Sequence, residues 1–286
     1  MKIGKMPIFN IVMKNLVAIL LLLSTGLQAQ TIEHSFGIDW RTATITITAV
    51  YADKYSPLLR ANGEKTLDGY IDSFFKTQIL ELNYDSYRKL KDLALIEPGI
   101  MNRLNDLGLR GEKISTKMSK GMDSLEVSYR FRLYPDVIDI FIKHKLPSLP
   151  YPLLSFAPSA NYSGILIVAD GELPVHGEYV NDELQPSLLP KIFDEDMRPI
   201  YTYNVAGPQA LRKWGPVMFA DAIDEDGFIN RIGQYPLKVS AIGIFGDNRS
   251  DIVLRNGDAE RILANEHNIN LLRDAKIVII ILPEAE

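Results

Sequence analysis

A cluster of prolines near the middle of the chain constrains its fold more than any other sequence feature. The 286-residue chain has four prolines within one stretch of twelve residues: Pro147, Pro150, Pro152 and Pro158. Proline has no amide hydrogen and restricts the preceding residue to extended geometry, so neither a helix nor a central strand runs through this stretch. The length suits two domains or one large one, and the proline cluster favours two. We therefore predict a proline-rich linker at 146–160 between domains at 30–145 and 161–286.

Residues 1–29 have the pattern of a secretory signal peptide. Three lysines and no acidic residue accompany an eight-residue apolar run at 16–23, and the small residue Ala29 follows as a cleavage position. The alternative is a retained anchor, but a membrane span needs about 20 apolar residues and Lys14 interrupts this segment. We predict cleavage near Ala29 and a periplasmic mature chain without a transmembrane span.

The first domain has the hydrophobic spacing of an α+β fold. Apolar residues alternate with threonines over 42–53, which predicts a half-buried strand. Between 67 and 82 apolar residues recur every three or four positions, which predicts a long amphipathic helix with Tyr70, Phe74 and Phe75 in the core rather than in a ligand cage. The remaining patterns complete a small antiparallel sheet covered by helices on one face, with helices at 87–96, 98–107 and 136–144 and a hairpin of 112–119 with 124–133.

The second domain has the pattern of a mixed α/β fold. Residues 165–169 and 276–282 are continuously apolar, as expected of strands that are covered on both faces. Pro208 opens a helix predicted to run to residue 220, and another helix begins with Asn256 or Asp258 as its cap. Further strands are predicted at 191–194, 198–202, 237–245 and 251–254.

The composition excludes several classes of function. The absence of cysteine excludes disulfides, zinc knuckles, thiol catalysis, Cys-ligated iron–sulfur clusters and a lipidated N-terminal cysteine. A formal net charge of −5 offers no basic surface for nucleic acid. The chain also lacks a phosphate loop, a nucleophile elbow, a zinc-protease motif and a dinucleotide fingerprint. We predict no catalytic residue, no cofactor and no metal site.

The scattered polar residues are better explained by structure than by catalysis. The four histidines occur singly along the chain, at His34, His144, His176 and His267. A lone histidine is usually a surface residue, even beside a carboxylate. The acidic run 194–196 reads as the tip of a hairpin, because adjacent acids point in different directions.

One acidic segment, residues 222–230, can be tested as a calcium loop. With Gly227 at loop position six, Asp224 and Asp226 occupy positions three and five. Ala222 and Gly233 then fall where the loop requires an aspartate and a bidentate glutamate. The segment is therefore predicted to be a solvated turn rather than a calcium site.

Several separated blocks of the second domain resemble the FlgP-like family of bacterial envelope proteins. The likeness extends over residues 162–282 and rests on YSGILIVADG at 162–171, PSLLPKIFDED at 186–196, YPLKVSA at 235–241, GDNRSDIVLRNGDA at 246–259 and KIVIIIL at 276–282. This family is related to small outer-membrane lipoproteins that include a Helicobacter surface antigen. The first domain shares the order of strand, long helix and hairpin, with few identical residues.

Some positions depart from the family pattern. The first strand ends with Asp170 and Gly171 where the family has an arginine and a glycine, and Met197 stands where the turn usually has glycine. The chain has no cysteine, so the lipid anchor of the family does not carry over.

The resemblance implies non-enzymatic work in the cell envelope. FlgP-like proteins are associated with flagellar basal bodies and assemble into rings, so the resemblance implies envelope or flagellar partners and a homo-oligomer. A periplasmic module that binds a peptide or small ligand is the alternative, and a pocket between the domains would favour it. A hydrolase whose site is assembled in space is a third hypothesis, because such a site leaves no local motif.

Overall fold

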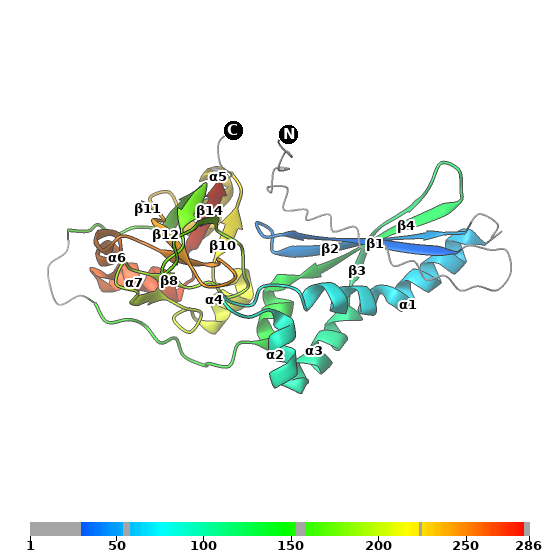
Figure 1. Ribbon diagram of the computed structural model, residues 1–286, viewed down its shortest axis with the longest axis horizontal. Coiled ribbons are helices and arrows are strands. Elements are labelled where there is room, and N and C mark those ends of the chain that lie inside the picture. The colour runs from blue at the N-terminus through cyan, green and yellow to red at the C-terminus, as the bar shows by residue number, and fades with distance from the viewer. Residues whose placement is uncertain (1–29, 54–57, 153–157, 223–224, 283–286) are drawn as a thin grey trace.

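The computed structural model describes residues 30–53, 58–152, 158–222 and 225–282. The predicted signal peptide lies outside this range. Figure 1 shows two bodies joined end to end, which we call the N-terminal body (residues 30–140) and the C-terminal body (residues 163–282). The first is an antiparallel sheet with helices and the second is a mixed α/β body, so the predicted fold class is confirmed.

A four-stranded antiparallel sheet, in the order β1-β2-β4-β3, forms the N-terminal body. Its strands are β1 (Thr31–Asp39), β2 (Thr44–Ala52), β3 (Glu112–Met118) and β4 (Ser124–Arg132). The predicted strand at 42–53 and the predicted hairpin are therefore present. Strand β1 was not among the predicted elements, and it forms one edge of the sheet.

Helix α1 (Leu59–Ile79) covers one face of this sheet, as Figure 1 shows. Its residues Leu67, Phe75 and Ile79 are fully buried, and the Phe75 ring stacks on Phe131 of β4 with 4.3 Å between the ring centroids. Phe74 is buried as predicted, whereas Tyr70 is 42% exposed. The aromatic stripe is therefore mostly core, with one member at the surface.

The helices that follow agree with the prediction in part. Helices α2 (Leu90–Ile96) and α3 (Pro98–Gly108) are present, with Pro98 in the first turn of α3. The predicted helix at 136–144 is wrong, because the chain forms only a π turn, η1 (Leu133–Val137), and a 3-10 turn, η2 (Ile138–Ile140). Pro135 lies before the predicted helix, and the chain leaves helical geometry after Phe141 and has no regular structure over residues 142–144.

Two four-stranded sheets form the C-terminal body, rather than one. The first sheet is parallel, with β5 (Ile165–Asp170) and β14 (Ile277–Leu282) at its centre and β10 (Met218–Ala220) and β11 (Leu237–Ser240) at its edges. Both central strands are buried almost throughout, as their apolar runs predicted. The second sheet is mixed, in the order β12-β13-β8-β9, with strands β8 (Ile192–Phe193), β9 (Pro199–Tyr201), β12 (Gly243–Phe245) and β13 (Asp251–Val253).

The remaining elements cover these two sheets. Helix α5 packs Phe228 and Ile232 against Leu166 and Ile280 of the parallel sheet. A separate two-stranded sheet pairs β6 with β7. The bounds of these elements are α4 (Pro208–Trp214), α5 (Glu225–Ile232), α6 (Asn256–Leu263), α7 (Glu266–Arg273), β6 (Glu172–Pro174) and β7 (Asn181–Glu183).

Three predictions for the C-terminal body were wrong in detail. The helix predicted to run to residue 220 ends at Trp214, because Gly215 turns the chain with a φ of +72° and residues 218–220 join the parallel sheet. The strand predicted at 237–245 is two strands in different sheets. Residues 225–230 of the acidic segment belong to helix α5 rather than to a turn, while Asp224 lies outside the described residues.

The cap predicted for α6 was also wrong. Arg255 occupies the cap position and provides no side-chain hydrogen bond to the helix. The Asn256 side chain instead accepts a hydrogen bond from the Glu195 amide at 3.2 Å, and the Asn256 amide donates to Glu195 Oε2 at 2.8 Å. These bonds fix the hairpin tip of β8 and β9, in agreement with the reading of residues 194–196.

The hairpin tip contains a strained residue. Met197 has a φ of +59°, in the left-handed region that favours glycine. We expect Met197→Gly to raise the free energy of unfolding by about 0.5–1 kcal/mol, since relief of strain exceeds the extra chain entropy of glycine. Chemical denaturation measures this change. Met197→Ala removes the same side chain but keeps Cβ, so an equal gain from that variant would contradict the backbone explanation.

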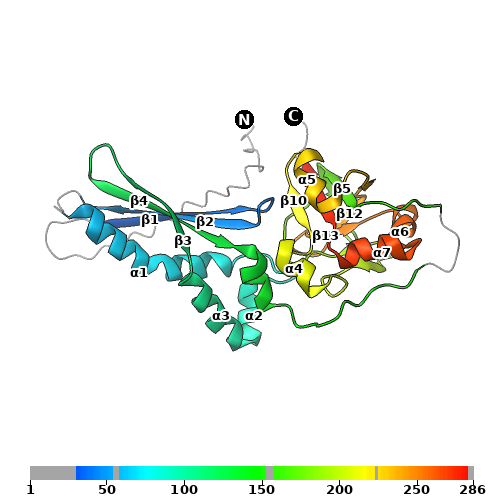
Figure 2. The ribbon, with the colours of Figure 1, turned by 180° about the vertical axis from the view of Figure 1, so that it is seen from behind.

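The two bodies share one continuous hydrophobic core. Trp40, in the turn between β1 and β2, contacts Phe219 of β10 edge to face, with 5.7 Å between the ring centroids. Tyr134, which follows β4, packs against Gly215 so closely that a Cβ there would overlap its ring. Figure 2 shows α4 beside the segment that follows β4. The bodies therefore pack directly against each other.

A loop of the N-terminal body also inserts into the C-terminal body. Asn248 donates its backbone amide to Ser86 O and its side-chain amide to Asp85 O, both at 2.8 Å. The Asp85 side chain holds this loop by accepting hydrogen bonds from the amides of Tyr87 and Arg88. The docked loop gives the interface a second, polar point of attachment.

A buried arginine lies beside this interface. Arg231 of α5 is 3% exposed, and its guanidinium donates to the carbonyl oxygens of Ala275, Trp214 and Gly215 at 2.7–2.9 Å. Burial lowers its pKa to about 10, so it is still charged at neutral pH. Three carbonyl groups therefore take the place of a carboxylate partner, and the side chain ties the end of α4 to the loop before β14.

Candidate functional site

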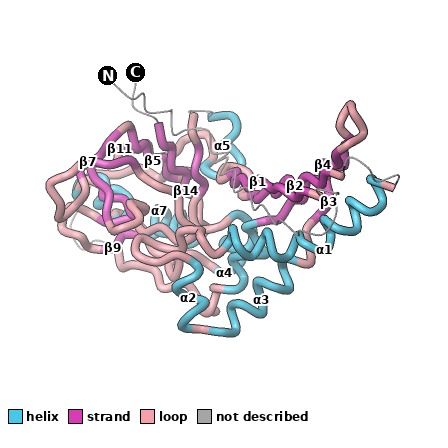
Figure 3. The backbone as a smooth tube through the Cα atoms, turned by 45° about the vertical axis from the view of Figure 1, so that its right-hand side comes forward, coloured by secondary structure: helices cyan, strands magenta, loops and turns pink. Residues whose placement is uncertain are grey.

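The edge of the N-terminal sheet at β1 is the feature most suited to contact another molecule. All nine residues of β1 pair with β2, from Thr31 opposite Ala52 to Asp39 opposite Thr44. No other strand lies beside β1 in the sheet order. Figure 3 shows this sheet extending from the C-terminal body. Edge strands of this length are uncommon without protection, because their free backbone groups can pair with another chain.

The register shows which residues of β1 direct their backbone N–H and C=O groups toward the free edge. The Leu133 amide donates to Ala43 O, and the Asp53 amide donates to Asp123 O. The odd-numbered residues of β2 therefore form the backbone hydrogen bonds to β4. Even-numbered residues of β2 therefore face β1 and bond to its odd-numbered residues. The backbone N–H and C=O groups that face the free edge belong to Ile32, His34, Phe36 and Ile38.

These outward groups are free within the described part of the chain. Outside its pairing with β2, β1 forms no backbone hydrogen bond with any other described residue. The strand also has no proline, lysine or arginine and no bulge, and its acidic residues are Glu33 and Asp39. It therefore lacks the lysine, proline or bulge that protects many edge strands.

The opposite edge of the sheet carries such devices. Strand β3 has an irregularity between Lys113 and Ser115, where the pairing with β4 shifts. Lys113 forms an ion pair with Asp68 at 3.0 Å, and Lys117 lies within 4.0 Å of Glu126. A bulge and charged side chains both discourage strand addition, so the two edges differ in their capacity for assembly.

Side chains on the inner face hold β1 in place. The His34 ring stacks on Phe74 of α1 with a centroid distance of 4.2 Å, and Phe36 is buried in the core. At the end of the strand, the Asp39 carboxylate accepts hydrogen bonds from the amides of Arg41 and Thr42 at 2.9 and 3.1 Å. These contacts hold β1 in the extended conformation that a pairing strand needs.

His34 makes the stability of this edge depend on pH. Its side chain is 5% exposed, its Nε2 atom has no hydrogen-bond partner among the described residues, and burial lowers its pKa. The folded state therefore holds fewer protons on this residue than the unfolded state once the pH falls below the ordinary histidine value of about 6.5. Stability is lost as the pH falls through this window to the lowered pKa.

We expect His34→Phe to remove this loss while it keeps the stack on Phe74. One proton accounts for at most about 1.4 kcal/mol per pH unit, so the variant should gain stability over the wild type between pH 7 and pH 5 within that limit. Denaturation at several pH values measures the difference. His176 is exposed, and His176→Phe is the control; an equal effect from that variant would contradict a role for burial.

The outer face of the sheet carries a row of small hydroxyl residues. The register places Ser35, Thr48, Ser128 and Ser115 side by side, one from each strand. The hydroxyls of Thr48 and Ser128 are 3.0 Å apart. Ser35 and Ser115 thus occupy the same row and face at the two opposite edges, which makes them matched positions for substitution.

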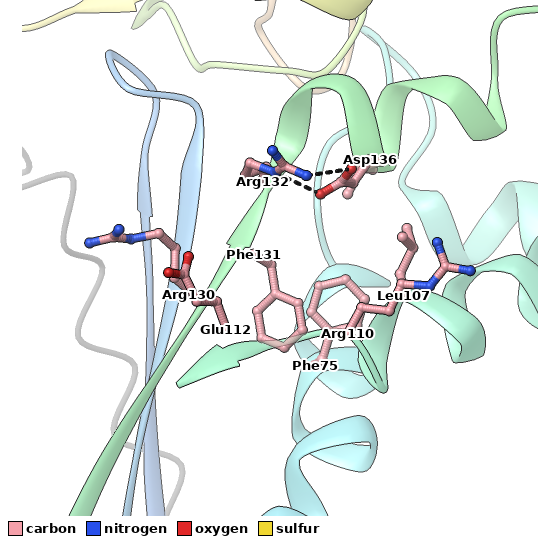
Figure 4. A pocket seen from close by; sticks show the side chains of 9 residues that line it. Phe75, Leu107, Arg110, Glu112, Arg130, Phe131, Arg132 and Asp136 are labelled. Atoms are coloured by element: carbon pink, nitrogen blue, oxygen red, sulfur yellow. Dashed lines mark hydrogen bonds and ion pairs between the residues drawn. The ribbon is translucent and has the colours of Figure 1, made fainter. Parts of the chain in front are cut away.

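A pocket of about 370 Å³ lies beyond the start of β3, beside the last residues of β4. Its apolar part includes the stacked rings of Phe75 and Phe131, and Arg132 forms an ion pair with Asp136 at 3.0 Å beside them. Figure 4 shows Arg110 and Arg130 extending outward from opposite sides of these rings. Neither of these two arginines has an ion-pair partner among the described residues.

The chemistry of this pocket suits a single negative charge. Its lining has three guanidinium groups, and the carboxylates of Glu112 and Asp136 leave one net positive charge. Leu133 donates its amide toward β2, so the amide of Arg132 points the other way, past the start of β3. Cationic groups around stacked aromatic rings match a carboxylate attached to an apolar group.

The other residues examined in the sequence do not form a site. His144 Nε2 donates to Ala206 O and His267 Nε2 donates to Tyr162 O, both at 2.8 Å, while His176 is exposed. Within the described ranges, no three His, Asp or Glu side chains are grouped so as to hold a metal ion.

No helix in these ranges is long and apolar enough to cross a membrane. The pocket beside Phe131 and another one, lined by Leu59 of α1 and Met118 of β3, both lie in the N-terminal body.

Two family models match the chain. Residues 31–140 are similar to the N-terminal domain of Treponema pallidum Tp0624, and residues 164–283 are similar to the second domain of the same protein. The matches follow the order of the two bodies, and the first begins at the first residue of β1. A search of curated proteins found no match. Neither description names an activity, and the likeness to the FlgP-like family stays a prediction.

Proposed function

We propose that the chain is a non-enzymatic assembly protein of the cell envelope that recruits a partner strand at the β1 edge. The observation that supports this most is the contrast between the two edges: β1 has nine regularly paired residues without lysine, proline or a bulge, and β3 is a bulged strand with lysines. Strand addition supplies affinity through backbone hydrogen bonds and needs no reactive side chain.

The proposal includes export to the periplasm. Predicted cleavage near Ala29 would leave β1, which begins at Thr31, next to the new N-terminus. The edge strand would then enter the periplasm without a long segment before it. The flagellar part of the proposal rests on the resemblance to FlgP-like proteins, which are associated with basal bodies.

Photo-crosslinking in the envelope tests the edge directly. A photoreactive phenylalanine analogue at Ser35 should capture a partner, whereas the same analogue at Ser115, in the same row at the opposite edge, should capture little. Gel mobility and mass spectrometry identify the adducts. Equal capture at both positions, or none at Ser35, would contradict assembly through β1.

Deletion of the gene tests the flagellar part separately. We expect impaired swimming and incomplete basal bodies, and both should be restored by the wild-type chain. Normal swimming with intact basal bodies would refute a flagellar role and would leave the edge itself to be judged by crosslinking.

The pocket beyond β3 supports a second candidate function, the binding of a carboxylate. We expect N-acetylphenylalanine to bind and its amide to bind at least tenfold more weakly, as a charge-assisted hydrogen bond is worth about 1.5–3 kcal/mol. Arg110→Gln and Arg130→Gln should weaken binding of the acid in titration calorimetry. Arg103→Gln, on α3 but outside the pocket, is the control. Equal affinity for acid and amide would refute this function.

A further inference from the structure

We infer that the strand recruited by β1 is the β1 strand of a second copy of this chain, paired antiparallel about a two-fold axis at Ser35. This inference rests on the proposed function, because it names the partner of the same edge. The joined sheet has eight strands, with the two β1 strands at its centre.

The register follows from the residues that face outward. Antiparallel pairing about Ser35 sets Ile32 opposite Ile38 of the second copy and His34 opposite Phe36. Each residue of β1 whose backbone groups face the free edge therefore lies opposite another such residue. Each such pair exchanges two backbone hydrogen bonds. All nine residues of the strand are used, from Thr31 opposite Asp39 to Asp39 opposite Thr31.

The charges of the strand favour this register over its neighbours. About Ser35, Glu33 lies opposite Gly37 and Asp39 lies opposite Thr31, so no acidic residues face each other. A shift that centres the pairing on Phe36 places Glu33 opposite Asp39 twice, and like charges directly opposite are unfavourable. A shift that centres it on His34 leaves Asp39 beyond the partner strand.

The helical side of the sheet is also compatible with a second copy. A two-fold axis perpendicular to the sheet keeps α1 of both copies on one face. Tyr70 of α1 is 42% exposed and stacks on Phe74, which in turn stacks on His34 of the edge strand. This partly exposed ring lies beside the joint, where pairing of the copies would cover it.

The position of the C-terminal body and the character of β3 set the form of this arrangement. The C-terminal body lies at the end of β1 where Asp39 and Trp40 are found (Figure 1). Because the paired strands are antiparallel, the two C-terminal bodies lie at opposite ends of the joined sheet. The outer edges are then both β3, which is bulged and charged, so the assembly closes as a dimer rather than extending as a fibre.

Charge substitutions at the axis test the inference. Ser35→Lys places two lysines directly opposite each other, and Ser35→Asp places two carboxylates there. We expect the dimer of the exported, purified chain to weaken on the order of 100-fold in each variant, since like charges across an interface are strongly unfavourable. A one-to-one mixture of the variants should restore a dimer, and Ser115→Lys should leave the wild-type dimer intact. Sedimentation with light scattering measures each mass, and circular dichroism checks that each variant is folded.

The outcomes separate this inference from the proposed function. A monomeric wild-type chain that still crosslinks to another protein through Ser35 overturns the self-pairing and keeps the edge as a recruiting surface. Loss of the dimer in Ser35→Lys without rescue by Ser35→Asp overturns the axis at Ser35. Equal loss in Ser115→Lys shows that β1 is not the joint.

Discussion

Replacing Gly215 with alanine is expected to lower the free energy of unfolding by about 3–5 kcal/mol, because overpacking of a core and a left-handed backbone each add a cost. Gly215 has a φ of +72°, and a Cβ on it would overlap the ring of Tyr134. The ring belongs to the N-terminal body and the glycine to the C-terminal body, so the new methyl group would force the bodies apart. Thermal and chemical denaturation measure the loss.

Gly177→Ala provides the matched control for Gly215→Ala. Gly177 also has a positive φ, +85°, but no atom lies within 4 Å of the position that its Cβ would take. This variant should show only the backbone cost of about 1–2 kcal/mol. If the two variants lose the same stability, the contact with Tyr134 contributes nothing and the interface is looser than its packing indicates.

The second large effect is expected at Arg231. Arg231→Met keeps much of the side-chain volume but leaves the carbonyl oxygens of Ala275, Trp214 and Gly215 without their donor. Leaving buried polar groups unpaired costs about 1–3 kcal/mol each, and relief of the buried charge offsets part of this, so we expect a net loss of about 3 kcal/mol.

Arg255→Met is the control for Arg231→Met. Arg255 is an exposed arginine of the same body, and its replacement should change stability by less than about 0.5 kcal/mol. Denaturation of both variants in parallel gives the comparison. A stable Arg231→Met protein would show that water reaches the three carbonyl groups and that the buried arginine is not what holds α4 to the loop before β14.

The fold class could be predicted from the sequence because its strongest patterns are local. The apolar run 276–282 and the helical spacing around Phe75 each leave little choice of structure. The junction at 215–220 could not be predicted in the same way, because the apolar residues there also suit a helix and the difference depends on Gly215. The hydrophobic pattern of residues 237–245 predicts one strand, since a bend between two sheets leaves no change in hydrophobicity.

The candidate site was harder to predict than the fold. Every second side chain of β1 faces the core, at Ile32, His34, Phe36 and Ile38. Because His34 and Gly37 are weak strand formers, this alternation does not stand out as a strand pattern in the sequence. That the strand lies at an edge depends on the pairing of four segments far apart in sequence. The pocket beside Phe131 likewise combines α3, β3 and β4, so only the folded chain places its arginines around the same rings.

The insertion of Ser86, Trp40 and Tyr134 into the C-terminal body has a practical consequence for anyone who cuts the chain at its prolines. Neither half carries a complete interior of its own, so each fragment would display aromatic surface that the intact chain conceals. Such fragments should bind unrelated proteins non-specifically and unfold at a lower temperature than the intact chain. Interaction screens with an isolated half would then detect non-specific binding to the exposed interface, so partners are better sought with the whole chain.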